Sequence, residues 1–168
     1  MSECTETHEE KLTLKVDVFL PGHDDRTETS LFSRTRKLLI ERDKVCFICG
    51  KTAEEVGPLE AHHHPIERSF ANMIDWVYFE RDCKAGFWGE GAQEFDWEGF
   101  FNAKLFEPMA FVDNMLANGM LTCKDHHTKP NEGIHTLPFP IWIAQKYGLD
   151  GYQFSEIEII HHPTQVLK

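Results

Sequence analysis

Residues 118–127 read NGMLTCKDHH, and residues 46–50 read CFICG. The first stretch contains a Cys-x2-His pair and the second a Cys-x2-Cys pair, and two such half-sites together can close a tetrahedral zinc. Two thiolates two residues apart on a tight turn bind one ion without strain, and Gly50 relaxes the backbone directly after the second. We therefore predict a structural zinc bound by Cys46, Cys49, Cys123 and His126.

The number and spacing of the cysteines favour a metal site over disulfide bonds. The chain has five cysteines, an odd number, and two of them form the Cys-x2-Cys pair. This pattern is typical of metal binding in a reducing compartment. A redox role for the pair lacks the strand-to-helix context of a thioredoxin and leaves Cys123 unexplained. Residues 1–11 are polar and acidic, without the basic start and apolar run of a secretion signal, so we expect a cytoplasmic protein.

Hydrophobic periodicity predicts a mixed α+β fold. Leucines and valines occupy every second position over 12–20, which is the period of a half-buried strand. A helix is expected from Ser30 as its N-cap, with one apolar face made by Leu31, Phe32, Thr35, Leu38 and Leu39. The tail is expected to add a short helix at 140–148 and a strand at 156–160. At 168 residues we expect one domain over 12–168, following a disordered acidic tail over 1–11.

Aromatic residues concentrate in one long segment. Residues 65–117 contain 12 of the 20 Phe, Trp and Tyr side chains, counted along the sequence. A linker would not be so apolar, so we predict an ordered insertion that packs on the metal-binding core and is helical around 70–83. No apolar run of about 18 residues is present, so no membrane-spanning segment is predicted.

Histidines follow both half-sites closely in the sequence. The run LEAHHH at 59–64 and the pair His126–His127 must approach each other if the cysteines share one ion. Imidazole suits a second metal site, and a neutral imidazole can accept a proton from water near neutral pH. A surface loop is the alternative interpretation for any one of these histidine pairs taken alone.

Taken together, these stretches resemble the HNH nucleases of the ββα-metal class. The lead-in TRKLLIERDKVCFICG is similar to the family's basic helix and first Cys-x2-Cys, LEAHHH to the strand that ends in its histidine doublet, and NGMLTCKDHH to its asparagine and second half-site. The tail HHTKPNEGIH resembles nucleases of phages and prophages. The resemblance implies a ββα-metal core stabilised by a Cys3His zinc site, in a bacterial or phage-infected cell.

The resemblance also implies roles for individual residues. His63 would be the general base, and Asn118 would hold the loop that bears it. The catalytic metal would be bound by His62, His127 and His135. The spacer between His127 and His135 contains Pro130 and Gly133, so it is not expected to form one continuous helix. The ion could be Mg²⁺, Mn²⁺, Ni²⁺ or Zn²⁺. Two alternatives stay open: the doublet could be His63 with His64, and His126 could bind the catalytic ion.

The net charge of −11 is unusual for a protein that binds nucleic acid. A local basic patch would have to face the phosphates, and its candidates are Arg34, Arg36, Lys37, Arg42, Lys44, Lys124 and Lys129. The predicted function is a metal-dependent DNA endonuclease. The alternative is a catalytically silent, zinc-stabilised module that binds a protein partner, such as a host-defence component, through the insertion. A nucleobase deaminase is disfavoured because H-x-E before Pro-Cys-x2-Cys is missing. RNA as substrate and a homodimer both stay open.

Overall fold

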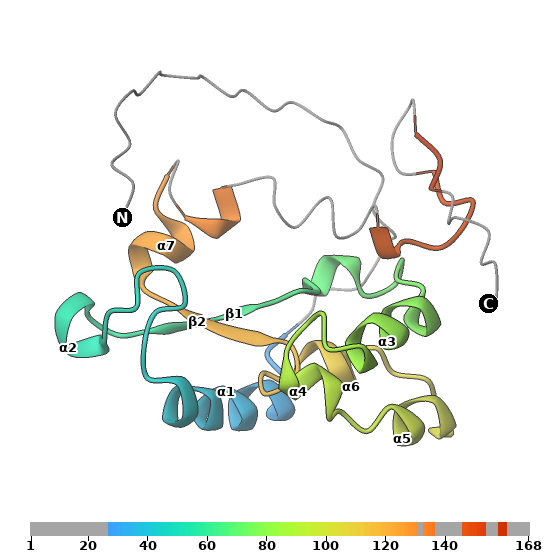
Figure 1. The fold of residues 1–168 in the computed structure, drawn as a ribbon, viewed down its shortest axis with the longest axis horizontal. Coiled ribbons are helices and arrows are strands. Elements are labelled where there is room, and N and C mark those ends of the chain that lie inside the picture. Colours follow the sequence, from blue (N-terminus) through green and yellow to red (C-terminus); the bar gives the residue numbers. More distant parts are fainter. Residues whose placement is uncertain (1–26, 131–132, 137–145, 154–157, 161–168) are drawn as a thin grey trace.

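A computed structural model of the chain describes residues 27–130, 133–136, 146–153 and 158–160. Its two strands are β1 (Glu60–His63) and β2 (Gly119–Thr122). The helices are α1 (Ser30–Asp43), α2 (Ala53–Val56), α3 (Trp76–Lys84), α4 (Glu90–Gln93), α5 (Trp97–Asn102), α6 (Met109–Val112) and α7 (Lys124–Thr128), with the 3-10 turns η1 (Arg68–Phe70) and η2 (Ile134–Thr136). The fold is therefore mixed α+β (Figure 1). Among the described residues, no helix has the length and apolar character needed to cross a membrane.

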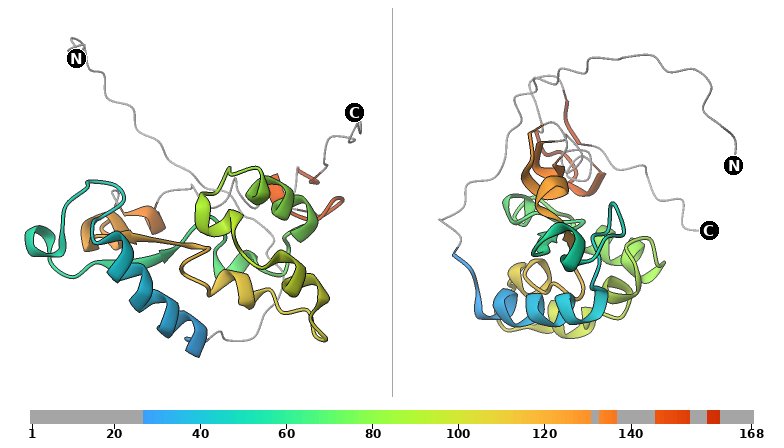
Figure 2. Two further views of the ribbon diagram at one scale, coloured as in Figure 1. Left: turned by 60° about the horizontal axis from the view of Figure 1, so that its bottom comes forward. Right: turned by 90° about the vertical axis from the view of Figure 1, so that its left-hand side faces the viewer.

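The two strands form one small antiparallel sheet with a helix on each side. Its register pairs His62 with Met120 and His63 with Gly119, so successive residues of β1 face opposite sides of the sheet. Helix α1 covers one side, and α7, which follows β2 directly, lies over the other (Figures 1 and 2). The sheet thus lies between α1 and α7.

Helix α1 is anchored to the sheet by a narrow apolar stripe. Leu39 is fully buried and packs in an apolar cluster with Leu59, Met115 and Leu121. The N-cap is Thr29, one residue before the predicted Ser30, and its Oγ1 accepts a hydrogen bond from the Phe32 backbone N–H (3.1 Å). Leu38 is 43% exposed, contrary to the predicted face. Leu38 lies one position, about 100° of helical rotation, away from Leu39 and so points off the stripe.

The insertion forms a second and larger core at one end of the sheet. Helices α3, α5 and α6 surround Phe79, Trp97 and Phe111, whose ring centroids lie 5.1–6.0 Å apart, mostly in edge-to-face or stacked geometry. The predicted ordered, aromatic packing is confirmed. The single helix expected over 70–83 is instead the turn η1 followed by α3, because Asp75 caps a new helix by accepting from the Tyr78 backbone N–H.

Several predicted segments lie wholly or mostly outside the described residues. These are the strand at 12–20, the tail at 1–11 and most of the helix at 140–148. For the strand predicted at 156–160, the described part makes one isolated antiparallel bridge, between Ile159 and Gln153.

Candidate metal centres

Four side chains from two distant segments meet where the zinc was predicted. The ligand atoms of Cys46, Cys49, Cys123 and His126 all lie within 4.8 Å of one another. His126 Nδ1 is 3.1 Å from Cys123 Sγ and 3.7 Å from Cys46 Sγ. Sulfur and nitrogen ligands of one tetrahedral zinc are separated by about 3.6 Å. This group could therefore hold a metal ion such as zinc.

Local backbone structure positions the first half-site. Gly50 has a φ of +69°, a left-handed conformation that lets the chain turn directly after Cys49. The Gly50 backbone N–H donates to the Cys46 carbonyl (2.8 Å), and the Phe47 backbone N–H donates to the Leu121 carbonyl of β2 (2.7 Å). The turn is thereby tied to the strand that leads into Cys123.

The electrostatics of the cluster also suit a cation. Burial raises the pKa of the Cys46 thiol, but hydrogen bonds from the backbone at Cys49, Cys123 and Ile48 outweigh it and lower that pKa to about 6. The Lys51 backbone N–H lowers the pKa of Cys49, yet burial and the charges on Cys46 and Cys123 raise it overall. Neighbouring thiolates repel one another, and a bound cation removes that repulsion.

Three imidazoles form a second cluster on the α7 side of the sheet. The ligand nitrogens of His62 on β1, His127 on α7 and His135 on η2 lie within 4.8 Å of one another. The His127 and His135 Nε2 atoms are 3.0 Å apart, and the His62 and His135 ring centroids are 4.7 Å apart. Three imidazoles are a frequent ligand set for zinc and other divalent ions. We call this cluster the histidine triad.

His62 has the environment of a metal ligand. Its side chain is 2% exposed, and its Nδ1 atom has no hydrogen-bond partner among the described residues. Burial, followed by the charges of His135 and His127, lowers the pKa of His62 to about 3, so the ring is neutral and keeps a lone pair for an ion. Its Nε2 lies 3.2 Å from Glu67 Oε1. Burial raises the pKa of Glu67 to about 7, opposed by the charge of Arg68.

Other residues orient the two remaining imidazoles. Glu60, on the same strand face two residues before His62, contacts His127 Nδ1 at 2.5 Å. This contact turns Nε2 toward the triad, as a carboxylate does for many metal-bound histidines. Gly133 lies so close to the end of α7 that an added Cβ would be 2.7 Å from the His127 carbonyl oxygen, which brings η2 and His135 against α7. Glu60 was not among the predicted site residues, although strand alternation places it on the same face as His62.

His63, the predicted general base, lies in a different environment. Its ring stacks on Phe32 of α1 (centroids 5.3 Å apart), and its Nε2 is 3.3 Å from Asp113 Oδ1. Asp113 is fully buried and also accepts from Arg68 Nε (2.8 Å) and Thr29 Oγ1 (2.7 Å). Burial raises the pKa of Asp113, but these hydrogen bonds outweigh it and hold the pKa below its ordinary value. Burial, followed by the charges of His127 and His63, lowers the pKa of His135, so His63 lies within electrostatic range of the triad.

The other two ambiguous histidines are placed apart from the triad. His126 contacts the thiols, as described above, and so sits with the predicted zinc ligands. The ring of His64 lies edge-on to Trp88 with centroids 5.9 Å apart, at the insertion side of the sheet. Of the triplet, His62 is the member that joins the triad.

Asn118 ties together the segments that flank the sheet. It is fully buried; its Oδ1 accepts from the Ile66 backbone N–H (2.9 Å), and its Nδ2 donates to the carbonyls of Ile66 (2.8 Å) and Val112 (2.9 Å). The loop after the histidine triplet is thereby fixed to the turn before β2.

We expect Asn118→Ala to destabilise the protein by roughly 3 kcal/mol or more, because the Ile66 N–H and the Ile66 and Val112 carbonyls each lose a buried partner at about 1–3 kcal/mol. The free energy of unfolding in urea measures this loss. Asn102→Ala, at an exposed asparagine, is the matched control and should change stability by less than about 0.5 kcal/mol. Equal destabilisation by the two variants would contradict the structural role of Asn118.

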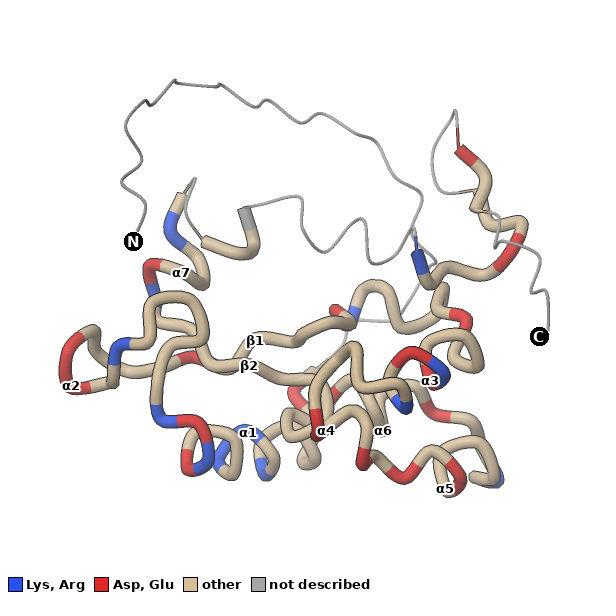
Figure 3. Tube along the Cα trace, viewed as in Figure 1, with Lys and Arg blue, Asp and Glu red and all other residues tan. Residues whose placement is uncertain are grey.

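The basic residues do not form one surface. Arg34, Arg36 and Lys37 belong to α1, whereas Lys124 begins α7 and Lys129 follows it. Figure 3 shows these two groups on opposite sides of the sheet. The residues Arg34, Lys37, Lys124 and Lys129 are exposed and Arg36 is partly exposed. Of these five residues, Lys124 and Lys129 near α7 share a side of the sheet with the triad.

Comparisons with protein-family models, with curated proteins and with solved structures found no match. The inference of function therefore depends on the residues and geometry of this chain and on the resemblance of its motifs.

Proposed function

We propose that the chain is a metal-dependent endonuclease of the HNH type that hydrolyses phosphodiester bonds in DNA. The convergence of His62, His127 and His135 carries this proposal, because three protein ligands leave coordination positions open for water and substrate. A closed Cys3His cluster next to it supplies a structural site of the kind that the resemblance implies. The chain order β1, β2, α7 also agrees with a ββα-metal core.

In this proposal His63 is the general base, and Asp113 orients its ring. A divalent ion bound by the triad would supply positive charge at the scissile phosphate. Asp113 Oδ1 accepts a hydrogen bond from the Nε2–H of His63, which leaves His63 Nδ1 unprotonated and able to accept a proton. His63 Nδ1 takes a proton from water, the water oxygen bonds to phosphorus, and one ester P–O bond breaks. The released alkoxide oxygen takes its proton from solvent.

Phosphate contacts are expected mainly on the α7 side. Lys124 and Lys129 lie on that side, whereas the basic residues of α1 lie beyond the sheet. With few basic groups near the triad and a net charge of −11, binding to duplex DNA should be weak and should fall steeply with salt.

A plasmid-nicking assay tests the proposal. Supercoiled plasmid is incubated at low salt with purified protein in Mg²⁺, Mn²⁺, Ni²⁺ or Zn²⁺, in parallel with His127→Ala. We expect nicking by the wild type in at least one metal, its loss with chelator, and a loss of 100-fold or more, on the order of that for a lost catalytic group, in the variant. His127→Ala should keep its structural zinc and its unfolding temperature, which excludes misfolding as the cause.

Two outcomes would reject the endonuclease. Equal cutting by the wild type and His127→Ala would identify a contaminating nuclease. Cutting in none of the metals would favour the second candidate, a zinc-stabilised binding module. That candidate is supported by apolar side chains of the insertion that are exposed to solvent, among them Val77, Leu105 and Phe106.

A further inference from the structure

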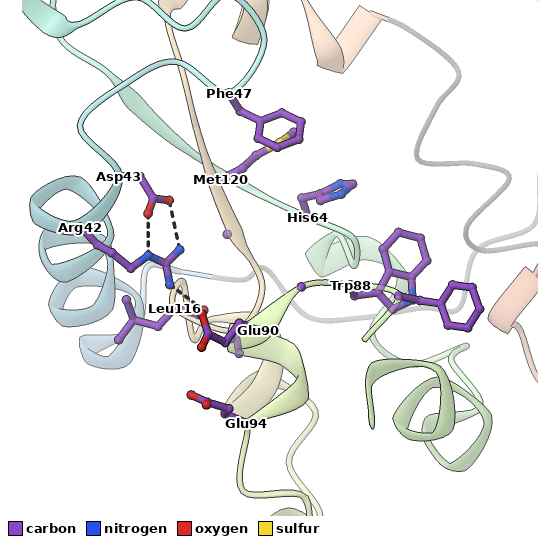
Figure 4. A pocket seen from close by; sticks show the side chains of 14 residues that line it. Arg42, Asp43, Phe47, His64, Trp88, Glu90, Glu94, Leu116 and Met120 are labelled. Carbon is purple, nitrogen blue, oxygen red and sulfur yellow. Dashed lines mark hydrogen bonds and ion pairs between the residues drawn. The ribbon is translucent and has the colours of Figure 1, made fainter. Parts of the chain in front are cut away.

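A large cavity opens beside the sheet, between the end of α1 and the insertion. Its volume is about 850 Å³, within the range of small-molecule sites. Figure 4 shows Phe47 and Met120 on one wall, His64 and Trp88 on the next, and Arg42, Glu90 and Glu94 along the opposite side. The nuclease proposal does not use this cavity.

The cavity adjoins the histidine triad along the sheet. Met120, which lines it, is the cross-strand partner of His62, and paired residues of antiparallel strands project on the same face. His64 follows directly after β1, two residues beyond His62, and lines the cavity, so the chain leads from the triad toward the cavity. Directly opposed residues are about 4.5–5.5 Å apart. A phosphate at the triad would therefore place the adjoining nucleotide at the mouth of the cavity.

Aromatic rings line the cavity and remain available to a ligand. Phe47 is 69% exposed and Phe87 is 70% exposed, which is unusual for such large apolar side chains. Trp88 is held rigidly, because its Nε1 donates to the Tyr147 hydroxyl (2.8 Å) and its ring stacks on Phe79. Lys146 Nζ lies 5.5 Å from the Phe87 ring centroid. Exposed aromatic faces such as that of Phe47 are the surfaces on which unpaired bases stack.

The charges of the lining disfavour phosphate and favour hydrogen-bond donors. Arg42 is engaged by Asp43 (Nη2 to Oδ2, 3.0 Å) and donates to the Leu116 carbonyl (3.3 Å). Glu90 and Glu94 add two further carboxylates, which Figure 4 shows on the same side of the cavity as Arg42. Carboxylates repel phosphate but accept from the exocyclic amino group of a base such as cytosine.

We infer that this cavity binds an unpaired nucleobase that carries an exocyclic amino group, next to the phosphate held at the triad. The inference rests on the proposed nuclease function and narrows its substrate class to single-stranded or locally unpaired nucleic acid. A base within a duplex is stacked and paired, so its face and its Watson–Crick edge are hidden from such a cavity.

Fluorescence anisotropy with short labelled DNA oligomers tests the inference without catalysis. Binding is measured with the zinc-containing protein and no added divalent metal, for oligo-dC, oligo-dT and a duplex. We expect oligo-dC to bind most tightly, by about fivefold or more over oligo-dT. Phe47→Ala and Phe87→Ala should each weaken oligo-dC binding by about fivefold or more. Leu105→Ala, at a leucine that is 77% exposed and outside the cavity, is the matched control and should not.

The carboxylates are tested by the double variant Glu90→Gln and Glu94→Gln, which should shrink the preference for oligo-dC over oligo-dT. Oligo-dC binding unchanged in both phenylalanine variants, or equal affinity for duplex and single strand, would overturn the inference. Tight binding of a trimethyllysine peptide in place of the oligomers would overturn it in favour of a cationic ligand. Binding is measured here without added divalent metal and cutting is measured with it, so failure of the cavity and failure of the nuclease proposal give different results.

Discussion

Replacement of Cys46 or Cys123 by alanine is expected to release the zinc and to unfold the region around the sheet. Both thiols are buried, and both lie in the apolar cluster that also contains Leu39 and Leu121. A structural zinc contributes an apparent binding free energy of about 10–16 kcal/mol at neutral pH. This binding free energy equals or exceeds the stability of most whole domains, which is about 5–15 kcal/mol. The region around the sheet should therefore unfold when the ion is lost.

Metal analysis and thermal unfolding measure this prediction together. The wild type should contain about one tightly bound zinc per chain, and either variant should contain little and lose its cooperative transition. Cys83→Ala is the matched control, because Cys83 is fully buried in the aromatic core and belongs to no metal cluster among the described residues. It should lose stability yet keep its zinc. If Cys46→Ala keeps zinc and unfolds like Cys83→Ala, the Cys3His cluster does not bind the ion.

Sequence spacing predicted the Cys3His cluster because each half-site is local. Cys-x2-Cys and Cys-x2-His fix two pairs of ligands within one turn each, and any ion they share brings the two turns together. The same closure places His62 near His127, which the structure also has. The local spacings of cysteine and histidine therefore predicted which side chains would cluster as possible metal ligands.

Residues that depend on the path of the insertion could not be predicted in this way. Asp113 reaches His63 across 50 positions of sequence, and its place at the C-terminal end of α6 gives no local signal for that contact. The predicted basic patch that combined Arg34 with Lys124 is divided between two sides of the sheet for a related reason. Which side of a sheet a helix covers is decided by tertiary packing, and α1 and α7 cover opposite sides.

The second large effect is expected at His63 and its buried carboxylate. His63→Asn should lower the rate of plasmid cutting by about 10²–10⁴-fold, the usual contribution of a general base. Asp113→Asn should lower it by about 10–100-fold, because the amide no longer holds the His63 ring with Nε2 protonated. Neither change removes a triad ligand, so both variants should bind the catalytic metal as the wild type does.

Stability must be separated from catalysis, since Asp113 also binds Arg68 and Thr29. Loss of the carboxylate charge weakens its ion pair with the Arg68 guanidinium, at a cost of up to about 3–5 kcal/mol. Asp82→Asn is the matched control. Asp82 is also buried and accepts from Lys146 Nζ (2.8 Å) and the Tyr147 hydroxyl (2.8 Å), but it lies in the aromatic insertion.

Both aspartate variants should therefore unfold at lower urea concentration, whereas only Asp113→Asn should cut more slowly per folded molecule. The comparison is made below the onset of unfolding, with the folded fraction of each variant measured by circular dichroism. Full activity of folded Asp113→Asn together with loss in His63→Asn would show that His63 acts without its carboxylate. Full activity of both would remove His63 from the reaction, and the base would then have to be sought elsewhere around the triad, where Glu67 lies 3.2 Å from His62.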